Sequence, residues 1–366
     1  MALAERLPDF PWDTLADARR AAEAYPGGIV DLSVGTPVDP TPGIAVDALA
    51  AAGDSPGYPT VWGDPSTRAA IRGYLERRWA SVPLTDDSVM PVVGTKELVG
   101  WLPTLLGIGD GAAVVFPECA YPTYEVGALT SGARAVAFDD PEAIPADARL
   151  VWINSPANPS GRILSADETR AFVAAARRIG AVLASDECYG EFAWEAEPVS
   201  VLDPRVNDGD LTGLLAVHSL SKRSNAAGYR AGFVAGDPAV VQELVAARKH
   251  LGMMLPRPIQ AAMVALLGDQ DHVEEQRARY LARRALLRPA LEAAGFRVDH
   301  SEGSLYLWAT RDEDCRASVA WLAERGILAA PGDFYGPAAA RHVRVALTAT
   351  DERVAEAAAR LSPHAP

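Results

Sequence analysis

The chain has 366 residues, of which 49% are hydrophobic and 22% are charged, a balance typical of a folded globular protein. Its 34 basic and 48 acidic residues give a net charge of −14, which argues against nucleic acid or anionic membranes as partners. A chain of this length is expected to form one large domain with a smaller domain packed against it.

The start of the chain and its cysteines both predict a cytoplasmic location. Residues 1–20 lack the basic start and apolar run of a signal peptide. The longest apolar stretches are too short to span a membrane. Cys119, Cys188 and Cys315 are far apart and form no C-x-x-C pair, which is typical of free thiols in a reducing compartment.

From about residue 89, short β-rich runs alternate with longer amphipathic stretches. Strands are predicted at residues 89–93, 112–116, 133–138, 149–153, 181–185, 214–219 and 231–236. Helices are predicted at 96–106 and at 165–180, where Ser165 and Glu168 have the spacing of a capping box. This alternation predicts an α/β domain with a mainly parallel sheet that helices cover on both faces.

The pattern changes after about residue 272. A long helix rich in arginine and alanine is predicted at 273–294, and strands and a helix near 316–325 follow it. This order is typical of a compact α+β domain. We therefore predict a large domain at residues 41–272 and a small domain at residues 273–366. The N-terminal segment, residues 1–40, is expected to join the small domain.

The most informative stretch is SLSKRSNAAGYRAGF at residues 219–233, directly after the apolar run LLAVH. A lysine at the mouth of a parallel sheet lies where ligands bind in such folds. Arg230 can offer a planar, two-pronged donor to a phosphate, and the hydroxyl groups of Ser219 and Ser221 can add single donors. We therefore expect Lys222 to lie in a site that binds a phosphate.

Three other motifs lead to weaker interpretations. Ser219 and Lys222 also fit the S-x-x-K motif of penicillin-recognising enzymes, but the companion S-D-N and K-T-G motifs are missing. Asp186-Glu187-Cys188 is a poor metal site, because adjacent strand residues point to opposite faces and no histidine cluster accompanies them. The glycines at 107–111 precede a strand, whereas a dinucleotide-binding motif would follow one. We expect no bound metal.

The run S-L-S-K-x-x-N-A-x-G-x-R-A-G resembles the lysine signature of class I and II aminotransferases. The resemblance implies the fold of the fold type I pyridoxal-phosphate enzymes, with pyridoxal 5′-phosphate as cofactor. It implies that Lys222 binds the cofactor covalently and then moves the substrate's α-proton, and that Ser219, Ser221 and Arg230 bind the phosphate.

Other landmarks of the family follow in the same order along the chain. Gly94, Thr95 and Lys96 open a helix after a strand, and the exposed amides and the helix dipole suit a phosphate. By resemblance, these three residues belong to the cofactor site, where Thr95 and the backbone amide of Lys96 bind the phosphate. Tyr121, in ECAYPTYEV, corresponds to the aromatic residue that stacks on the cofactor ring.

The polar partners of the ring are also implied by the resemblance. Asn158, in an N-P-x-G turn, and Tyr189 correspond to residues that hydrogen-bond the cofactor's phenolic oxygen. Asp186 follows a buried strand, where a carboxylate needs a cationic partner. The resemblance implies that this partner is the protonated ring nitrogen of the cofactor. It also implies that Asp186 and Tyr189 act together with Lys222 in catalysis.

Three further matches extend the resemblance over residues 35–344. Tyr58 corresponds to a tyrosine that reaches the phosphate in the neighbouring subunit, which implies a homodimer with the site at its interface. Gly35 corresponds to a glycine whose backbone contacts the substrate carboxylate. Arg344, in HVRVALT, corresponds to the arginine that binds the α-carboxylate with two hydrogen bonds.

Within the family, the segments VGTPVDPTP and GYPTVWGDPSTRAAI look most like actinobacterial N-succinyldiaminopimelate aminotransferases. This implies amino-acid and 2-oxo-acid substrates in lysine and diaminopimelate biosynthesis, with glutamate as amino donor. Arg257 and Lys249 are possible partners for the distal anionic groups. The alternatives are an aspartate, aromatic or alanine aminotransferase, or a pyridoxal-phosphate C–S lyase. A ligand-sensing domain of a transcription regulator would need a basic helix-turn-helix, for which residues 1–30 are too short.

Overall fold

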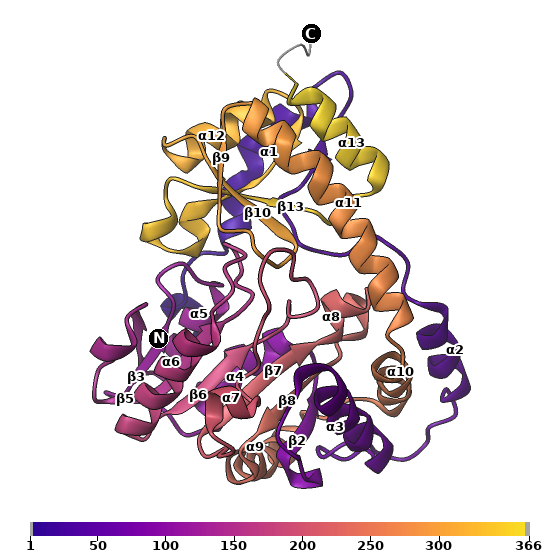
Figure 1. The fold of residues 1–366 in the computed structure, drawn as a ribbon, viewed down its shortest axis with the longest axis vertical. Helices are drawn as coiled ribbons and strands as arrows, with labels where there is room; N and C mark the ends of the chain where they lie inside the picture. The colour runs from indigo at the N-terminus through magenta and orange to yellow at the C-terminus, as the bar shows by residue number, and fades with distance from the viewer. Residues whose placement is uncertain (1–2, 363–366) are drawn as a thin grey trace.

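A seven-stranded sheet lies at the centre of the larger part of the molecule (Figure 1). The computed structural model describes residues 3–362, so the outermost ends of the two predicted terminal segments lie outside the described residues. The sheet has the order β2-β8-β7-β6-β5-β3-β4. Its strands are β2 (Val89–Val92), β3 (Ala113–Phe116), β4 (Arg134–Ala137), β5 (Ala148–Asn154), β6 (Val182–Asp186), β7 (Leu214–Ser219) and β8 (Gly232–Gly236).

Strands β4, β3, β5, β6 and β7 run parallel, and β8 runs antiparallel to both of its neighbours. The predicted α/β fold with a mainly parallel sheet is therefore confirmed, with β8 as the exception. The helices of this part are α2 (Gly43–Ala51), α3 (Pro65–Trp79), α4 (Thr95–Leu105), α5 (Thr123–Ser131), α6 (Ala166–Ile179), α7 (Pro204–Asn207), α8 (Leu220–Arg223), α9 (Pro238–Leu251) and α10 (Arg257–Gly268).

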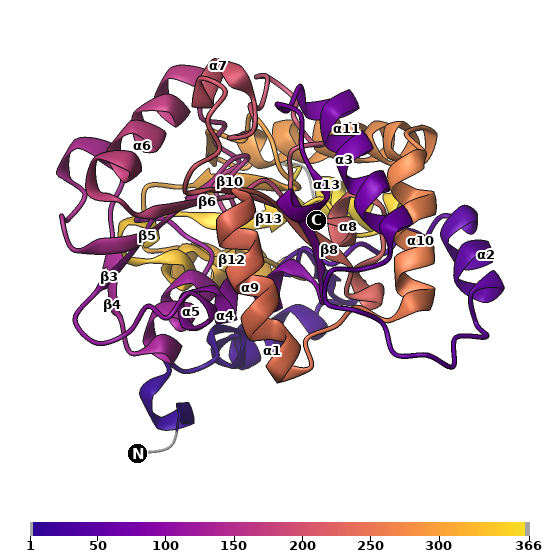
Figure 2. The same ribbon diagram turned by 90° about the horizontal axis from the view of Figure 1, so that it is seen from below.

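Helices cover both faces of the sheet, as Figure 2 shows from below. Val115 packs with α3, α6 and α10 on one face, and its neighbour Val114 packs with α4, α5 and α9 on the other. Successive residues of a strand are thus buried in the hydrophobic cores on opposite faces of the sheet. This explains why these strands consist of apolar residues without interruption. The capping box predicted at Ser165 and Glu168 is present at the start of α6.

The smaller part contains an antiparallel sheet of order β12-β13-β10-β9. Its strands are β9 (Arg297–Asp299), β10 (Tyr306–Thr310), β12 (Ala330–Pro331) and β13 (Val343–Ala346), and its helices are α11 (Asp271–Ala293), α12 (Cys315–Ala323) and α13 (Asp351–Arg360). From the N-terminal segment, α1 (Ala16–Glu23) packs on α12, and β1 (Val30–Asp31) pairs in parallel with β11 (Ile327–Leu328). The domain boundaries after residues 40 and 272 stay predictions.

Short 3₁₀ helices complete the described chain, and no helix within residues 3–362 is long and apolar enough to cross a membrane. The 3₁₀ helices are Leu3–Arg6, Pro11–Leu15, Asp86–Ser88, Pro141–Ala143, Ala227–Tyr229, Gly332–Tyr335 and Pro337–Ala339.

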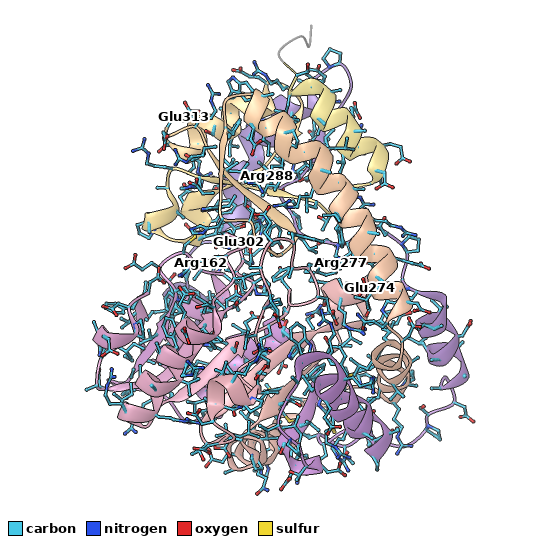
Figure 3. The ribbon with its side chains drawn as sticks, in the orientation of Figure 1. Arg162, Glu274, Arg277, Arg288, Glu302 and Glu313 are labelled. Carbon is cyan, nitrogen blue, oxygen red and sulfur yellow. The ribbon has the colours of Figure 1, made fainter. Side chains whose placement is uncertain are left out.

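Helix α11 runs from the larger part of the molecule into the smaller one (Figure 1). Its basic side chains, two of which are labelled in Figure 3, fasten it to the loop that follows β6. Arg277 donates a hydrogen bond of 2.7 Å to the carbonyl of Ala193, and its guanidinium lies 5.4 Å from the ring centre of Trp194. Arg288 forms an ion pair of 2.6 Å with Glu195.

Asp39 ties the N-terminal segment to the same helix. Its carboxylate accepts hydrogen bonds of 2.8 and 2.7 Å from the guanidinium of buried Arg283, and one of 2.7 Å from Gln276. Burial alone would raise the pKa of Asp39, but the bonds from Arg283 and Gln276 outweigh it, so the pKa is lowered. The ion pair therefore stabilises the fold while Asp39 is ionised.

We expect Asp39→Asn to destabilise the protein by about 2 kcal/mol at pH 7, because a buried arginine loses one of its carboxylate partners. Since the folded pKa is the lower one, this difference is fully present above the unfolded pKa near 4 and is lost as the pH falls through the folded value. Urea unfolding followed by tryptophan fluorescence at pH 7 and at pH 3 tests this. The exposed Asp167, paired with Arg170 on α6, provides the control, and Asp167→Asn should change little. A difference that is the same at both pH values would contradict the prediction.

Candidate active site

A cavity of about 540 Å³ lies where the small sheet faces the carboxyl ends of β5, β6 and β7. Asn154, Asp186 and Ser219 end these three neighbouring strands and line the cavity from below. Most of the residues singled out in the sequence also line it: Gly35, Thr95, Lys96, Tyr121, Asn158, Asp186, Tyr189, Ser219, Ser221, Lys222, Arg230 and Arg344. The chain thus collects at one place residues that are up to 309 positions apart, counted from Gly35 to Arg344.

One wall of the cavity offers a set of donors that fits a phosphate. Gly94 precedes α4 with a φ of +76°, and a Cβ atom there would overlap the guanidinium of Arg230. The missing side chain therefore allows Arg230 to approach the first amides of α4, which carry the positive end of the helix dipole. Ser219 and Ser221 add hydroxyl groups, and the Ser219 hydroxyl accepts a hydrogen bond of 3.1 Å from the Ser221 amide.

Lys222 extends into the cavity from α8, and its ammonium group donates a hydrogen bond to the carbonyl of Gly35. Desolvation lowers the pKa of this ammonium group, and Arg344 and Arg230 act in the same direction against the opposing effect of Tyr306. A lowered pKa raises the fraction of neutral amine, which is the form that can attack an aldehyde or accept a proton.

Asp186 is buried at the end of β6. Its carboxylate accepts hydrogen bonds of 2.7 Å from the Tyr124 hydroxyl and of 3.2 Å from the Cys188 amide. Burial raises the pKa of Asp186, and these bonds only partly oppose it. A protonated ring nitrogen facing this carboxylate would favour its ionised form, so the residue fits the partner that the sequence predicts.

Asn158 and Arg344 meet across the two parts of the molecule. Arg344 donates hydrogen bonds of 2.8 Å to the Asn158 side-chain oxygen and of 2.7 Å to the carbonyl of Ser33. Because the oxygen of Asn158 is used in this way, its amide nitrogen is left to donate to a ligand. Arg344 is buried, and its nitrogens have further hydrogens that can bind a carboxylate.

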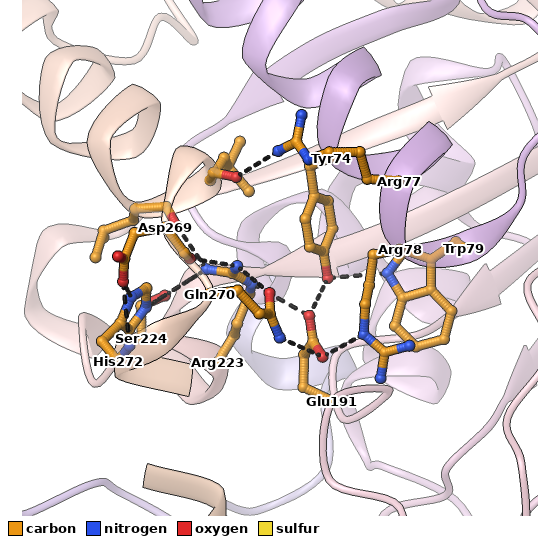
Figure 4. A network of polar contacts seen from close by, with 12 residues as sticks. Tyr74, Arg77, Arg78, Trp79, Glu191, Arg223, Ser224, Asp269, Gln270 and His272 are labelled. Carbon is orange, nitrogen blue, oxygen red and sulfur yellow. Dashed lines mark hydrogen bonds and ion pairs between the residues drawn. The ribbon is translucent and has the colours of Figure 1, made fainter. Parts of the chain in front are cut away.

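A network of polar side chains surrounds Arg223, the residue that follows Lys222 (Figure 4). Arg223, next to Lys222, lies 3.4 Å from the carboxylate of buried Glu191, which also accepts hydrogen bonds from Tyr74 (2.8 Å) and Arg78 (2.9 Å). Burial would raise the pKa of Glu191, but Arg223 and Arg78 lower it overall. The ionised network fastens α8 to the segment that carries Asp186 and Tyr189.

Two of the predicted site residues and both predicted anion partners lie elsewhere. Gly94 is beside the cavity without lining it, and Tyr58 is 91% exposed outside it. That Tyr58 reaches a neighbouring subunit stays a prediction. Arg257 lies 3.7 Å from Asp64, and neither it nor Lys249 lines the cavity.

Several residues that line the cavity were not predicted as site residues: Phe10, Trp12, Val34, Thr36, Val99, Asn154, Cys188, Ala227 and Tyr306. Asn154 could have been found as a polar residue at the end of a buried strand. Its side chain donates a bond of 2.8 Å to the carbonyl of Asp186 and accepts one of 2.7 Å from the amide of Asn158. Tyr306 lies in an apolar strand pattern, which predicts only that it is a core residue.

The matches to known proteins agree with one another over nearly the whole chain. The family model for class I and II aminotransferases matches residues 28–361. A probable aminotransferase of Mycobacterium tuberculosis is 60% identical over 97% of this chain and 85% of its own length. A 4-dedimethylamino-4-oxo-anhydrotetracycline transaminase of Streptomyces rimosus is 55% identical over 97% of this chain and 99% of its own. An LL-diaminopimelate aminotransferase of Dehalococcoides mccartyi is 31% identical over 99% and 98%.

Solved structures give the same result for the fold. An aminotransferase from Neisseria meningitidis superposes with a TM-score of 0.90 at 30% identity, covering 98% of each chain. A probable N-succinyldiaminopimelate aminotransferase from Thermus thermophilus superposes with a TM-score of 0.86 at 26% identity, covering 96% of this chain and 99% of its own.

We expect Lys222→Ala to abolish the visible absorption band of the protein mixed with pyridoxal phosphate and to reduce turnover by roughly a thousandfold or more. The variant lacks both the amine that bonds the aldehyde and the base that moves a proton. Spectra and glutamate-dependent turnover measure the two effects. Lys249→Ala, which changes an exposed lysine outside the cavity, should leave both at wild-type levels. Wild-type activity in the Lys222 variant would refute the assignment.

Proposed function

The chain belongs to the class I and II aminotransferases, which use pyridoxal phosphate, and we propose that it is an N-succinyl-L,L-2,6-diaminopimelate:2-oxoglutarate aminotransferase of lysine and diaminopimelate biosynthesis. The observation that carries this choice is the pair of cationic side chains, Arg344 and Lys96, in one cavity. Glutamate, 2-oxoglutarate and the succinylated substrate each carry a carboxylate next to the reacting carbon and at least one more at a distance.

The two cations suit these two kinds of carboxylate. Arg344 is buried among aromatic rings and can form the two-pronged pair that fixes an α-carboxylate. Lys96 is exposed, its ammonium lies 5.8 Å from the ring centre of Phe10, and it forms no ion pair with any residue from 3 to 362. A flexible cation at the cavity wall can follow distal carboxylates of different length, as the two substrates require.

The remaining residues divide the chemical work. When bound, pyridoxal phosphate supplies a conjugated ring that draws electron density from the substrate's α-carbon. Asp186 would hold a proton on the ring nitrogen, and Asn158 and Tyr189 would hydrogen-bond the phenolic oxygen. Lys222, as a neutral amine, would accept the α-proton of the substrate and later release it.

The names of the relatives support a diaminopimelate-type substrate without deciding it. The Dehalococcoides mccartyi relative is named for LL-diaminopimelate, and the Thermus thermophilus structure for its N-succinyl derivative. A second candidate has its own observation, since the relative that is 55% identical is named for the amination of a keto group on an anhydrotetracycline. That candidate predicts a bulky ring ketone as acceptor.

A substrate screen on the purified holoenzyme tests the proposal. N-succinyl-L,L-diaminopimelate, L,L-diaminopimelate, aspartate, phenylalanine and alanine serve in turn as amino donors to 2-oxoglutarate, and glutamate formation is measured. We expect kcat/KM for the succinylated substrate to exceed that for the others by at least about tenfold. A preference for aspartate, phenylalanine or alanine would overturn the proposal, as would pyruvate release from cystathionine without a 2-oxo acid. Glutamate-dependent amination of a ring ketone alone would favour the second candidate.

The same screen on Lys96→Met separates the role of the distal cation. We expect KM to rise about tenfold for glutamate and for the succinylated donor, and to change little for alanine, which has no distal carboxylate. An equal rise for all three donors would show that Lys96 acts on the cofactor instead.

A further inference from the structure

Tyr306 contacts Tyr189 and Arg344 in the site, although no motif marks it. Its hydroxyl lies 2.9 Å from the hydroxyl of Tyr189, and the two ring centres are 5.6 Å apart. The guanidinium carbon of Arg344 lies 4.0 Å from the centre of its ring. Tyr306 is 2% exposed and lines the same cavity as Lys222.

The position of this hydroxyl group is tightly constrained. A Cβ atom built on Gly35 would overlap the Tyr306 hydroxyl, so the glycine provides the space that the phenol occupies. The carbonyl of Gly35 meanwhile accepts the hydrogen bond from Lys222. The hydroxyl is thus held between Gly35 and Tyr189, close to the amine that does the chemistry.

The direction of the hydrogen bond between the two phenols follows from the single hydrogen that each hydroxyl group carries. If Tyr189 donates its hydrogen to a ligand in the cavity, it can only accept in the 2.9 Å contact, so Tyr306 is the donor there. Burial alone would raise the pKa of Tyr306, but Arg344 and Lys222 lower it below its usual range, which suits a donor.

We propose that Tyr306 is a positioning residue that donates a hydrogen bond to Tyr189 and so aims the hydrogen of Tyr189 at the phenolic oxygen of bound pyridoxal phosphate. The proposal rests on the assignment of Tyr189 to that oxygen and applies to any amino donor, so failure of the succinyl-substrate proposal would leave it intact. Hydrogen bonds in such a chain polarise and strengthen one another. A stronger bond to the phenolic oxygen favours its ionised form and lowers the pH at which the cofactor's visible band titrates.

Tyr306→Phe tests the proposal, because it removes the donor and keeps the ring beneath Arg344. We expect the titration midpoint of the visible band to rise by about half a pH unit to one unit. We expect kcat to fall about three- to tenfold, with little change in KM for the amino donor. The other titratable and charged groups around the phenol are unchanged in this variant: Lys222, Arg344, Tyr189, Cys188, Tyr121, Tyr280 and Tyr335.

Tyr335→Phe is the matched control. Tyr335 is also buried beneath Arg344, at 5.1 Å, but its hydroxyl has no hydrogen-bond partner in the described part of the chain. This variant should leave the midpoint of the visible band unchanged. An equal shift in the control, or no shift in Tyr306→Phe, would overturn the proposal.

Two further measurements keep the test independent of turnover. In a Tyr189→Phe background, Tyr306→Phe should no longer move the band, and a full additional shift there would show that Tyr306 acts by another route. In the cofactor-free protein, ultraviolet titration should show one phenol that ionises below the ordinary tyrosine range and that Tyr306→Phe removes. Its persistence in the variant would contradict the placement of the Tyr306 hydroxyl beside Arg344 and Lys222.

Discussion

The guanidinium group of Arg344 is buried where three parts of the chain meet, and the geometry of the whole site depends on that meeting. One nitrogen donates to Asn158 in the larger part of the molecule, and another donates to the carbonyl of Ser33 in the N-terminal segment. A buried cation without partners is strongly destabilising, so these segments are held together around it. Because the group that suits a substrate carboxylate also joins these parts of the fold, carboxylate binding at Arg344 would be coupled to their arrangement.

Sheet geometry provides the other half of the site. In the parallel register, Asn154 of β5 is opposite Asp186 of β6, and β7 beside them ends at Ser219. Neighbouring strands are about 4.8 Å apart, so the groups that suit a ring nitrogen and a phosphate are spread along one sheet edge over the width of a small aromatic ligand. The ionised Glu191 network in Figure 4 then fixes the loops behind Asp186 and Lys222 relative to each other. Residues that support a site in this way hold its functional side chains in place although they do not themselves contact the ligand.

The parts of the site that could be predicted from the sequence are those that depend on local chain order. Lys222 and Arg230 share one run of fifteen residues, and the end of a buried strand marks Asp186. Tyr124 and Tyr306 could not be found in this way, because their roles depend on partners 62 and 117 residues away. Each is part of an ordinary apolar pattern, and only the packing of the helix or strand shows which way its hydroxyl points. The alternation of elements predicted the α/β sheet for the same reason, since periodicity is local, whereas the antiparallel direction of β8 depends on a turn that has no periodic signal.

The role proposed for Arg344 would also connect substrate recognition to the acidity of Tyr306. The guanidinium above the ring lowers the pKa of that phenol, and a carboxylate bound to Arg344 would offset part of its charge. Tyr306 would then become a weaker donor to Tyr189 at the moment when the substrate is bound. Under the role proposed for Tyr306, the phenolic oxygen of the cofactor would lose stabilisation as its ionised form and take up a proton more readily. By linkage, the protonation state of the cofactor must change the affinity of the carboxylate by the same factor. Under these two proposals, a single buried arginine would couple the binding of the carboxylate to the protonation state of the cofactor.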